Sequence, residues 1–122
     1  MEIKIVHLYP DLLNLFGDKG NIAALEKRCL WRDISAEITE IKGKNLPDLE
    51  NCDILYIGGG SDAEQEMVLE KLAKIKDKIK DYVENGGVIL ATCGGFQMLG
   101  DLELIDVKHK PAQKRASGNV VM

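Results

Sequence analysis

A cysteine stands between small residues at the point where an apolar segment ends. Residues 91–97 read Ala-Thr-Cys-Gly-Gly-Phe-Gln, with Cys93 at the centre of the turn. A nucleophile between small residues at a strand-to-helix turn is the arrangement of a nucleophile elbow, here in a cysteine version. The residues two positions before and after the nucleophile must be small, and Ala91 and Gly95 meet this requirement. The pattern predicts nucleophilic attack by a thiolate.

The elbow would also activate Cys93. The amino terminus of the following helix lowers a thiol pKa, and the backbone N–H of Gly94 would point to a developing oxyanion. A cysteine at a strand end can equally be a core residue. Cys29 falls on the apolar stripe of a predicted helix and Cys52 directly precedes a predicted strand, so we expect both to be core residues.

Three consecutive glycines follow another apolar segment, at residues 58–60. Glycines here permit a close backbone approach, and Gly58 or Gly59 could supply a second oxyanion N–H. The alternative is a flexible turn into a helix. The run matches neither a G-x-G-x-x-G pattern nor a Walker pattern, so it favours acyl chemistry over nucleotide binding.

The elements that position these loops are an alternation of strands and helices. Apolar runs predict buried strands at residues 3–8, 54–57 and 88–91, and alternation predicts a more exposed strand at 35–41. Helical spacing predicts a helix over residues 21–32, with Asn21 as its cap, and a long helix over 61–85. The long helix carries one apolar stripe, formed by Ile75, Ile79, Tyr82 and Val83.

This alternation predicts an α/β fold, a doubly wound parallel sheet in one domain. In such sheets the ligand site lies outside the carboxyl ends of the strands. Three loops should therefore meet at one edge, at residues 9–21, 58–65 and 92–97.

Length and composition agree with one globular domain. The chain has 122 residues, 45% of them hydrophobic and 30% charged, with a net charge of -4. No apolar run is long enough to span a bilayer, which predicts a soluble cytoplasmic protein. The acidic balance argues against nucleic-acid binding, and the three widely spaced cysteines indicate neither a disulfide framework nor a zinc site. We expect no metal and no cofactor.

The carboxyl-terminal segment is basic. Residues 108–122 contain three lysines and Arg115 but no carboxylate. A solvated loop is the plain interpretation. The functional interpretation is a site for an anionic group.

Four segments, in order along the chain, resemble class I (triad) glutamine amidotransferase domains. They are residues 9–21, 58–65, 93–100 and 114–121. The resemblance is closest to the cobyric acid synthase-like branch, which includes the glutaminase subunits of lipid II isoglutaminyl synthases. It implies a flavodoxin-like sheet of the amidotransferase type.

The resemblance also implies a role for each matching residue. Cys93 would attack the side-chain amide of L-glutamine, forming a glutamyl thioester and releasing ammonia. Gly94 and one of Gly58 or Gly59 would bind the oxyanion. Gln97 and Arg115 would hold the substrate, and a guanidinium suits the bidentate recognition of an α-carboxylate.

A partner is implied as well. Ammonia would pass to a Mur-ligase-like synthetase subunit that amidates the D-glutamate of lipid II in peptidoglycan synthesis. The related alternative is the amidotransferase of cobyric acid synthesis. Within residues 9–21, the apolar side chains could dock on the synthetase or pack in the interior; they are Leu12, Leu13, Leu15 and Phe16.

The family's histidine base has no match in this chain. His7 lies inside a predicted strand, and His109 precedes Arg115, whereas the base follows the arginine in the family. We therefore expect the amino-terminal portion of an amidotransferase domain, inactive alone, with an exposed sheet edge or apolar surface that favours association between chains.

Two alternatives to this interpretation remain open. The chain could be a non-catalytic binding domain that keeps the fold without a complete triad. It could also belong to another elbow-cysteine family on this fold, in which an acidic residue such as Glu64 or Asp11 tunes the thiol.

Overall fold

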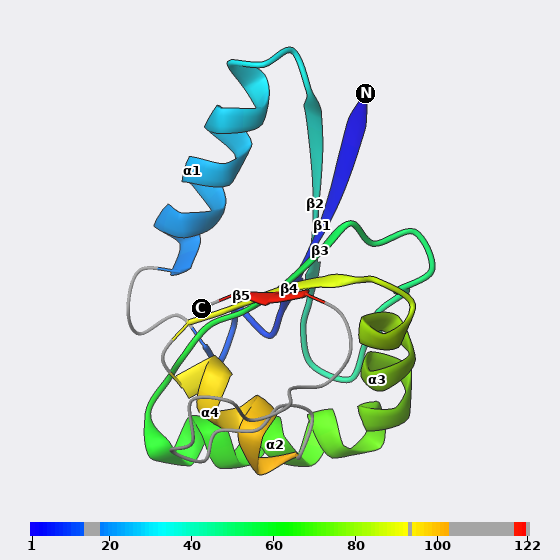
Figure 1. Ribbon diagram of the computed structural model, residues 1–122. Helices are drawn as coiled ribbons and strands as arrows, with labels where there is room; N and C mark the ends of the chain where they lie inside the picture. The colour runs from blue at the N-terminus through cyan, green and yellow to red at the C-terminus, as the bar shows by residue number, and fades with distance from the viewer. Residues whose placement is uncertain (14–17, 93, 103–118, 122) are drawn as a thin grey trace, which may run out of the picture.

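In the part of the chain that the structure describes, five parallel strands form one sheet in the order β2-β1-β3-β4-β5 (Figure 1). The computed structural model describes residues 1–13, 18–92, 94–102 and 119–121. The strands are β1 (Glu2–Leu8), β2 (Ser35–Ile41), β3 (Ile54–Ile57), β4 (Val88–Ala91) and β5 (Asn119–Val121). All the pairings are parallel, and this strand order is flavodoxin-like. The predicted doubly wound α/β fold is confirmed.

Helices cover both faces of the sheet (Figure 1). They are α1 (Asp18–Leu30), α2 (Asp62–Lys74), α3 (Lys76–Glu84) and α4 (Gly94–Asp101). Within the described part of the chain, no helix is long and apolar enough to cross a membrane.

The larger core lies between the sheet and helices α2, α3 and α4. Alternate strand residues point into it, and the helices contribute one apolar stripe each. The strand residues are Val6, Leu8, Leu55, Ile57, Ile89 and Ala91, and the helical ones include Val68, Leu72, Ile79, Val83, Met98 and Leu99.

Helix α1 packs on the opposite face, against a smaller core. Ile22 of α1 lies against Ile5 and Tyr56, and the ring of His7 meets that of Tyr56 edge-on at 5.0 Å. His7 is 1% exposed, as expected for a histidine within a strand. It is a core residue.

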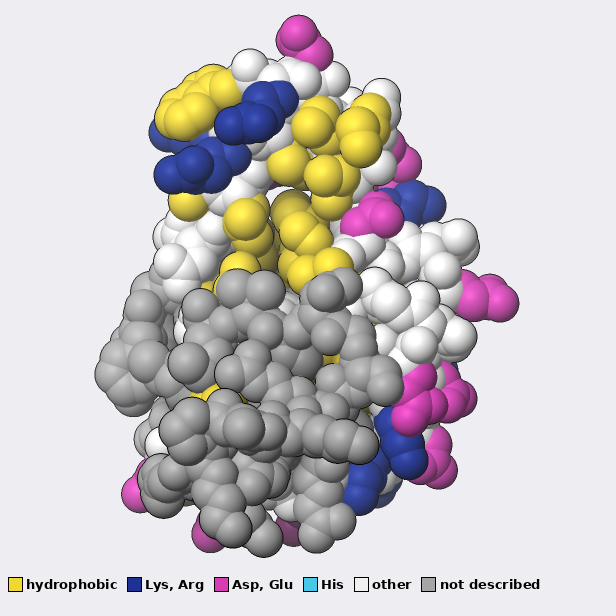
Figure 2. All heavy atoms as spheres, in the orientation of Figure 1, with side chains coloured by type: hydrophobic (Ala, Val, Ile, Leu, Met, Phe, Trp, Pro, Cys, Tyr) yellow, Lys and Arg dark blue, Asp and Glu magenta, His cyan; other side chains and the backbone are white. Residues whose placement is uncertain are grey.

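This smaller core is incompletely covered. Five apolar residues packed against it remain only partly buried: Ile3, Leu25, Ile38, Ile54 and Leu90. Hydrophobic side chains are visible beside α1 in Figure 2, and Leu30 and Trp31 at the end of that helix are 71% and 74% exposed.

The predicted single helix over residues 61–85 is wrong, because the chain bends at Ile75. Ile75 leaves helical geometry with φ −115° and ψ 15°, and its N–H bonds to the carbonyl of Leu72 rather than continuing the helix. The bend lets α2 and α3 run in different directions along the sheet (Figure 1) while Ile75 itself is buried in the core. The predicted apolar stripe is thus shared between the bend and α3.

The predicted cap of the first helix is also wrong. Helix α1 begins at Asp18, three residues before Asn21, and the side chain of Asn21 bonds to Tyr56 instead. The helix ends at Leu30 because Asp33 adopts a left-handed φ of 57°. The Ile34 N–H then bonds to the Cys29 carbonyl and the Asp33 N–H to that of Leu30, the pattern of a Schellman motif.

Candidate active site at the carboxyl edge of the sheet

The three predicted loops meet at the carboxyl ends of β1, β3 and β4. Gly60 lies against the first loop, since a Cβ placed on it would be 3.0 Å from the Leu12 carbonyl oxygen and 3.1 Å from a methyl carbon of Leu13. Gly95 lies against the second loop. A Cβ placed on Gly95 would clash with the Ile57 carbonyl oxygen and would lie 2.8 Å from the Gly58 carbonyl oxygen. The approach at Gly95 requires glycine, and a Cβ at Gly60 would be tightly packed.

Backbone hydrogen bonds fix the turn that carries the predicted nucleophile. The Thr92 N–H donates to the Ile57 carbonyl at 3.1 Å, which joins the end of β4 to the end of β3. The Gly95 N–H donates to the Thr92 carbonyl at 2.9 Å, which closes the turn into α4. Cys93 lies outside the described residues. Its neighbours on both sides form a tight strand-to-helix turn, as an elbow requires.

The predicted oxyanion residues are at this turn and in the glycine loop. Gly94 is the first residue of α4, where backbone N–H groups are not used within the helix and the helix dipole is positive. Gly94, Gly58 and Gly59 are all buried. The arrangement can present N–H groups to an anion in a site shielded from water.

The other residues considered for substrate binding or as the base lie in different places. Gln97 is exposed on α4, one turn after Gly94, where a ligand can reach it. Arg115 and His109 lie outside the described residues. His7 is buried in β1, so it is no match for a base that must reach the substrate.

Comparison with known proteins identifies the family. Residues 4–121 match the model of the CobB/CobQ-like glutamine amidotransferase domain. The chain belongs to this family. The amidotransferase domain is similar to the GatD subunit of lipid II isoglutaminyl synthase (glutamine-hydrolyzing) from Staphylococcus aureus, with 36% identity over 133 residues. That match covers 99% of this chain and 55% of the relative.

Two further relatives match shorter parts of the chain. GatD from Streptococcus pneumoniae is 39% identical over 101 residues, which cover 81% of this chain and 38% of that protein. A cobyric acid synthase from Listeria innocua is 34% identical over 82 residues, covering 67% of this chain and 16% of the relative. The amidotransferase chain thus spans about half, or less, of the length of these curated relatives.

One residue at this candidate site was missed by sequence reasoning. The side-chain Nε2 of Gln65 donates to the Gly60 carbonyl at 2.8 Å, and a Cβ on Gly94 would clash with this nitrogen. Gln65 therefore touches both the glycine loop and the elbow. The available signal was its place at the end of the 58–65 segment, which carries part of the family resemblance.

A second set of polar contacts reaches the elbow from the α1 face. The Asn21 Nδ2 donates to the Tyr56 hydroxyl at 2.9 Å, and this hydroxyl lies 3.4 Å from the Thr92 Oγ1. These side chains link α1, β3 and the end of β4, immediately before Cys93. The sequence predicts Asn21 as a helix cap and as the end of the first loop, but not this contact with Tyr56.

Glu64 is engaged in capping α2. Its Oε1 accepts from the Ser61 N–H at 3.1 Å and from the Ser61 hydroxyl at 2.8 Å, while the Glu64 N–H donates to the Ser61 Oγ. These hydrogen bonds, that of the backbone N–H first, lower the pKa of the Glu64 carboxyl. The carboxylate fits a capping box better than the thiol-tuning role that was the alternative.

The first loop packs inward where it is described. Leu13 is fully buried and Leu12 is partly buried against the main core, so the interior interpretation is confirmed for these two residues. Leu15 and Phe16 lie outside the described residues. Tyr9 begins the loop with a φ of 52°, and its backbone N–H donates to the Ile41 carbonyl at 2.8 Å.

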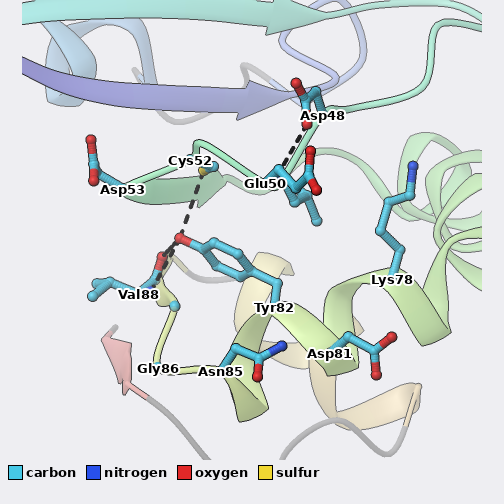
Figure 3. Close-up of a pocket in the computed structure, with 12 residues that line it drawn as sticks. Asp48, Glu50, Cys52, Asp53, Lys78, Asp81, Tyr82, Asn85, Gly86 and Val88 are labelled. Atoms are coloured by element: carbon cyan, nitrogen blue, oxygen red, sulfur yellow. Dashed lines mark hydrogen bonds between the residues drawn. The ribbon is translucent and has the colours of Figure 1, made fainter.

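A cavity of about 760 Å³ lies at the opposite, amino-terminal edge of the sheet (Figure 3). Its wall includes Cys52 and Tyr82. Among the predicted site residues that the structure describes, Gly58, Gly59, Gly94 and Gln97 do not line it. The Cys52 thiol lies 3.7 Å from the Tyr82 hydroxyl, and burial raises the pKa of this thiol. Within the described part of the chain, neither Cys52 nor the half-buried Cys29 forms a disulfide.

Proposed function

We propose that this chain is the glutaminase module of an amidotransferase that releases ammonia from L-glutamine. Membership of the CobB/CobQ-like glutamine amidotransferase family supports the reaction class. The observation that carries the proposal is the contact of Gly95 with the carbonyls of Ile57 and Gly58. It brings the elbow and the glycine loop together at the edge where a parallel sheet binds its ligand.

The proposed step is acyl transfer to sulfur. The Cys93 thiolate attacks the side-chain carbonyl carbon of glutamine, and the Gly94 N–H with that of Gly58 or Gly59 stabilises the oxyanion. A C–S bond forms, the C–N bond breaks, and the nitrogen leaves as ammonia after taking up a proton. Water then hydrolyses the thioester and releases glutamate. Gln97 and Arg115 are the proposed substrate-binding residues.

Activity of these 122 residues alone should be low. His7 is a buried core residue and cannot act as the base. A general base typically raises the reaction rate by a factor of about 10²–10⁴, and this gain would be lost. We propose a single amidotransferase domain that is incomplete at its carboxyl end; the chain spans about half of the length of the Staphylococcus aureus GatD relative. A non-catalytic binding domain is the competing proposal.

Labelling of Cys93 tests the catalytic proposal. The purified chain is incubated with a chloroketone analogue of glutamine, and the modified residue is found by peptide mass spectrometry. We expect one adduct on Cys93 that forms more slowly in the presence of glutamine and is lost in Cys93→Ser. A folded chain that gains no adduct, or gains it equally fast with saturating glutamine, would contradict catalysis and favour the binding domain.

For the ammonia acceptor, we propose the D-glutamate of lipid II, bound by a Mur-ligase-like synthetase subunit in the cytoplasm. The two GatD relatives, each named as a subunit of lipid II isoglutaminyl synthase, support this acceptor. The alternative, a corrinoid, is supported by the shorter match to cobyric acid synthase. Association between copies of the chain, through an exposed sheet edge or apolar surface, remains a prediction.

The acceptor is tested with glutamine labelled with ¹⁵N in its side-chain amide. The chain is combined with a Mur-ligase-like synthetase, ATP and lipid II, or with a cobyric acid synthase lacking its own glutaminase, ATP and corrinoid. Transfer of ¹⁵N to lipid II alone is the expected result. Transfer to the corrinoid alone would establish the alternative.

A further inference from the structure

The side chain of Gln65 connects the two backbone segments that the proposed oxyanion site needs. Its Nε2 donates to the Gly60 carbonyl oxygen at 2.8 Å, at the end of the glycine loop. The same amide covers Gly94, where a Cβ would clash with Nε2 and lie 2.7 Å from the amide carbon. One carboxamide therefore sets the separation between the loop and the elbow.

The position of Gln65 is itself fixed by the start of α2. Its backbone N–H donates to the Ser61 carbonyl at 2.8 Å, in the helical turn closed by the capping box of Ser61 and Glu64. The side chain is partly buried, so it is shielded from competing water on one side. A capped helix end gives the carboxamide a defined starting point.

The two glycines of the elbow, Gly94 and Gly95, are both closely packed, so the elbow has little room to move. On the other side of the elbow, Gly95 is in contact with the carbonyls of Ile57 and Gly58, which are backbone atoms that cannot move independently of the sheet. The elbow is thus held between β3 and the Gln65 amide. Movement of this amide would change the spacing of Gly94 from the glycine loop.

We propose that Gln65 is a positioning residue that keeps the N–H groups of the glycine loop and of Gly94 directed at one substrate oxygen. The inference rests on the proposed glutaminase function. Gln65 acts through Gly60 and Gly94 and takes no part in bond making. Oxyanion stabilisation depends on donors fixed before the reaction, so a loosened loop should slow the steps that pass through an oxyanion.

Two substitutions separate the hydrogen bond from the packing. Gln65→Glu keeps the shape but places an acceptor oxygen against the Gly60 carbonyl, which repels it. Gln65→Met keeps most of the volume and removes the donor. Glu66→Gln, at an exposed position in the same helix turn, is the matched control.

The test compares two reagents on Cys93. With a chloroketone analogue of glutamine, the thiolate adds to the ketone carbon and forms a tetrahedral oxyanion; the sulfur then moves to the adjacent carbon, the carbonyl re-forms and chloride leaves. Iodoacetamide alkylates the thiolate directly, with loss of iodide, and forms no oxyanion. We expect Gln65→Glu and Gln65→Met to slow the chloroketone roughly 10- to 100-fold, below the roughly 10²–10³-fold loss from deleting a donor outright. The iodoacetamide rate should change less than about twofold, and thermal unfolding is followed to confirm folding.

The outcomes distinguish this inference from the proposed function. If the unsubstituted chain reacts with the chloroketone and both Gln65 variants react equally fast, Gln65 does not position the site. If both reagents slow in parallel, the effect is on thiol access or thiolate formation, which also overturns the inference. If the unsubstituted chain gains no chloroketone adduct, the proposed function fails and the inference fails with it. Should Gln65→Glu not fold, Gln65→Met decides.

Discussion

The side-chain amide of Asn21 donates a hydrogen bond of 2.9 Å to the hydroxyl of Tyr56 and so ties α1 to the middle of the sheet. The Tyr56 hydroxyl is also 3.4 Å from the Thr92 Oγ1, one residue before Cys93. Helix α1 therefore has a polar connection to the elbow, in addition to the packing of Ile22 against Ile5 and Tyr56.

Removing this connection should destabilise the chain modestly. We expect Asn21→Ala to lower the free energy of unfolding by about 0.5–1.5 kcal/mol, the usual net value of a hydrogen bond. A double-mutant cycle with Tyr56→Phe, measured by urea unfolding, should show coupling between the two positions. Glu26→Ala, exposed in the same helix, should have little effect. Strictly additive effects of the Asn21 and Tyr56 substitutions would contradict a direct contribution from this bond.

Tyr82 should contribute stability through its hydroxyl. The hydroxyl donates to the Val88 carbonyl at 2.9 Å and accepts from the Val88 N–H at 3.1 Å, beside the cavity of Figure 3. Tyr82→Phe would leave both backbone groups without this partner, and we expect a loss of about 1–3 kcal/mol in the free energy of unfolding. Chemical denaturation near pH 7 measures it; an unchanged midpoint would show that water replaces the hydroxyl at no cost.

The same residue should make stability sensitive to high pH. Burial first, and then the contact with Cys52, raise the pKa of Tyr82 above its ordinary value of 10.0. Below pH 10 the hydroxyl is protonated in the folded and unfolded states alike. Above pH 10 the unfolded chain releases the proton and the folded chain keeps it, so the free energy of unfolding falls by about 1.4 kcal/mol per pH unit. Denaturation at several pH values should give a shallower decline for Tyr82→Phe.

The capping box of α2 gives a prediction in the acid range. Ser61→Ala should cost about 1 kcal/mol of stability, as is typical for a lost amino-terminal cap. It should also raise the pKa of the Glu64 carboxyl only part of the way to its ordinary value, because the Ser61 backbone N–H still donates to it. Titration by NMR reads this pKa directly. A Glu64 pKa that does not move would mean that the hydroxyl contributes nothing.

Two glycines should respond to alanine in opposite directions. Gly95→Ala would force a Cβ against the backbone of Ile57 and Gly58, so we expect clear destabilisation and loss of Cys93 labelling by the glutamine analogue. Gly20→Ala adds its Cβ where no atom lies within 4 Å, inside α1. It should stabilise the chain by about 0.5–1 kcal/mol through helix propensity. Thermal unfolding of both variants checks the contrast.

The strands were predictable because burial leaves a direct trace in the sequence. The apolar runs at residues 54–57 and 88–91 correspond to β3 and β4 residue for residue, and small residues around Cys93 indicated the turn into α4. The bend at Ile75 left no such trace. Its neighbours keep helical spacing, and only the packing of two helices on one sheet requires the chain to turn there.

The side-chain contacts of the site could not be predicted from the sequence, for a related reason. Asn21 and Gln65 are polar residues within helices, and their partners Tyr56 and Gly60 lie on other elements. Which polar residue of a helix contacts a given partner on another element depends on how the helix packs on the sheet. Local sequence patterns predict the helix but not how it packs.

The position of β1 has a consequence for synthesis of the chain. Strand β1 is made first, yet it lies inside the sheet and pairs with both β2 and β3, Ile5 standing beside Ile54. At about 5–20 residues per second, β3 emerges roughly 2 to 10 seconds after β1. During that interval the apolar side chains of Ile5, Val6 and Leu8 are without one neighbouring strand. The nascent chain is then open to non-native strand pairing.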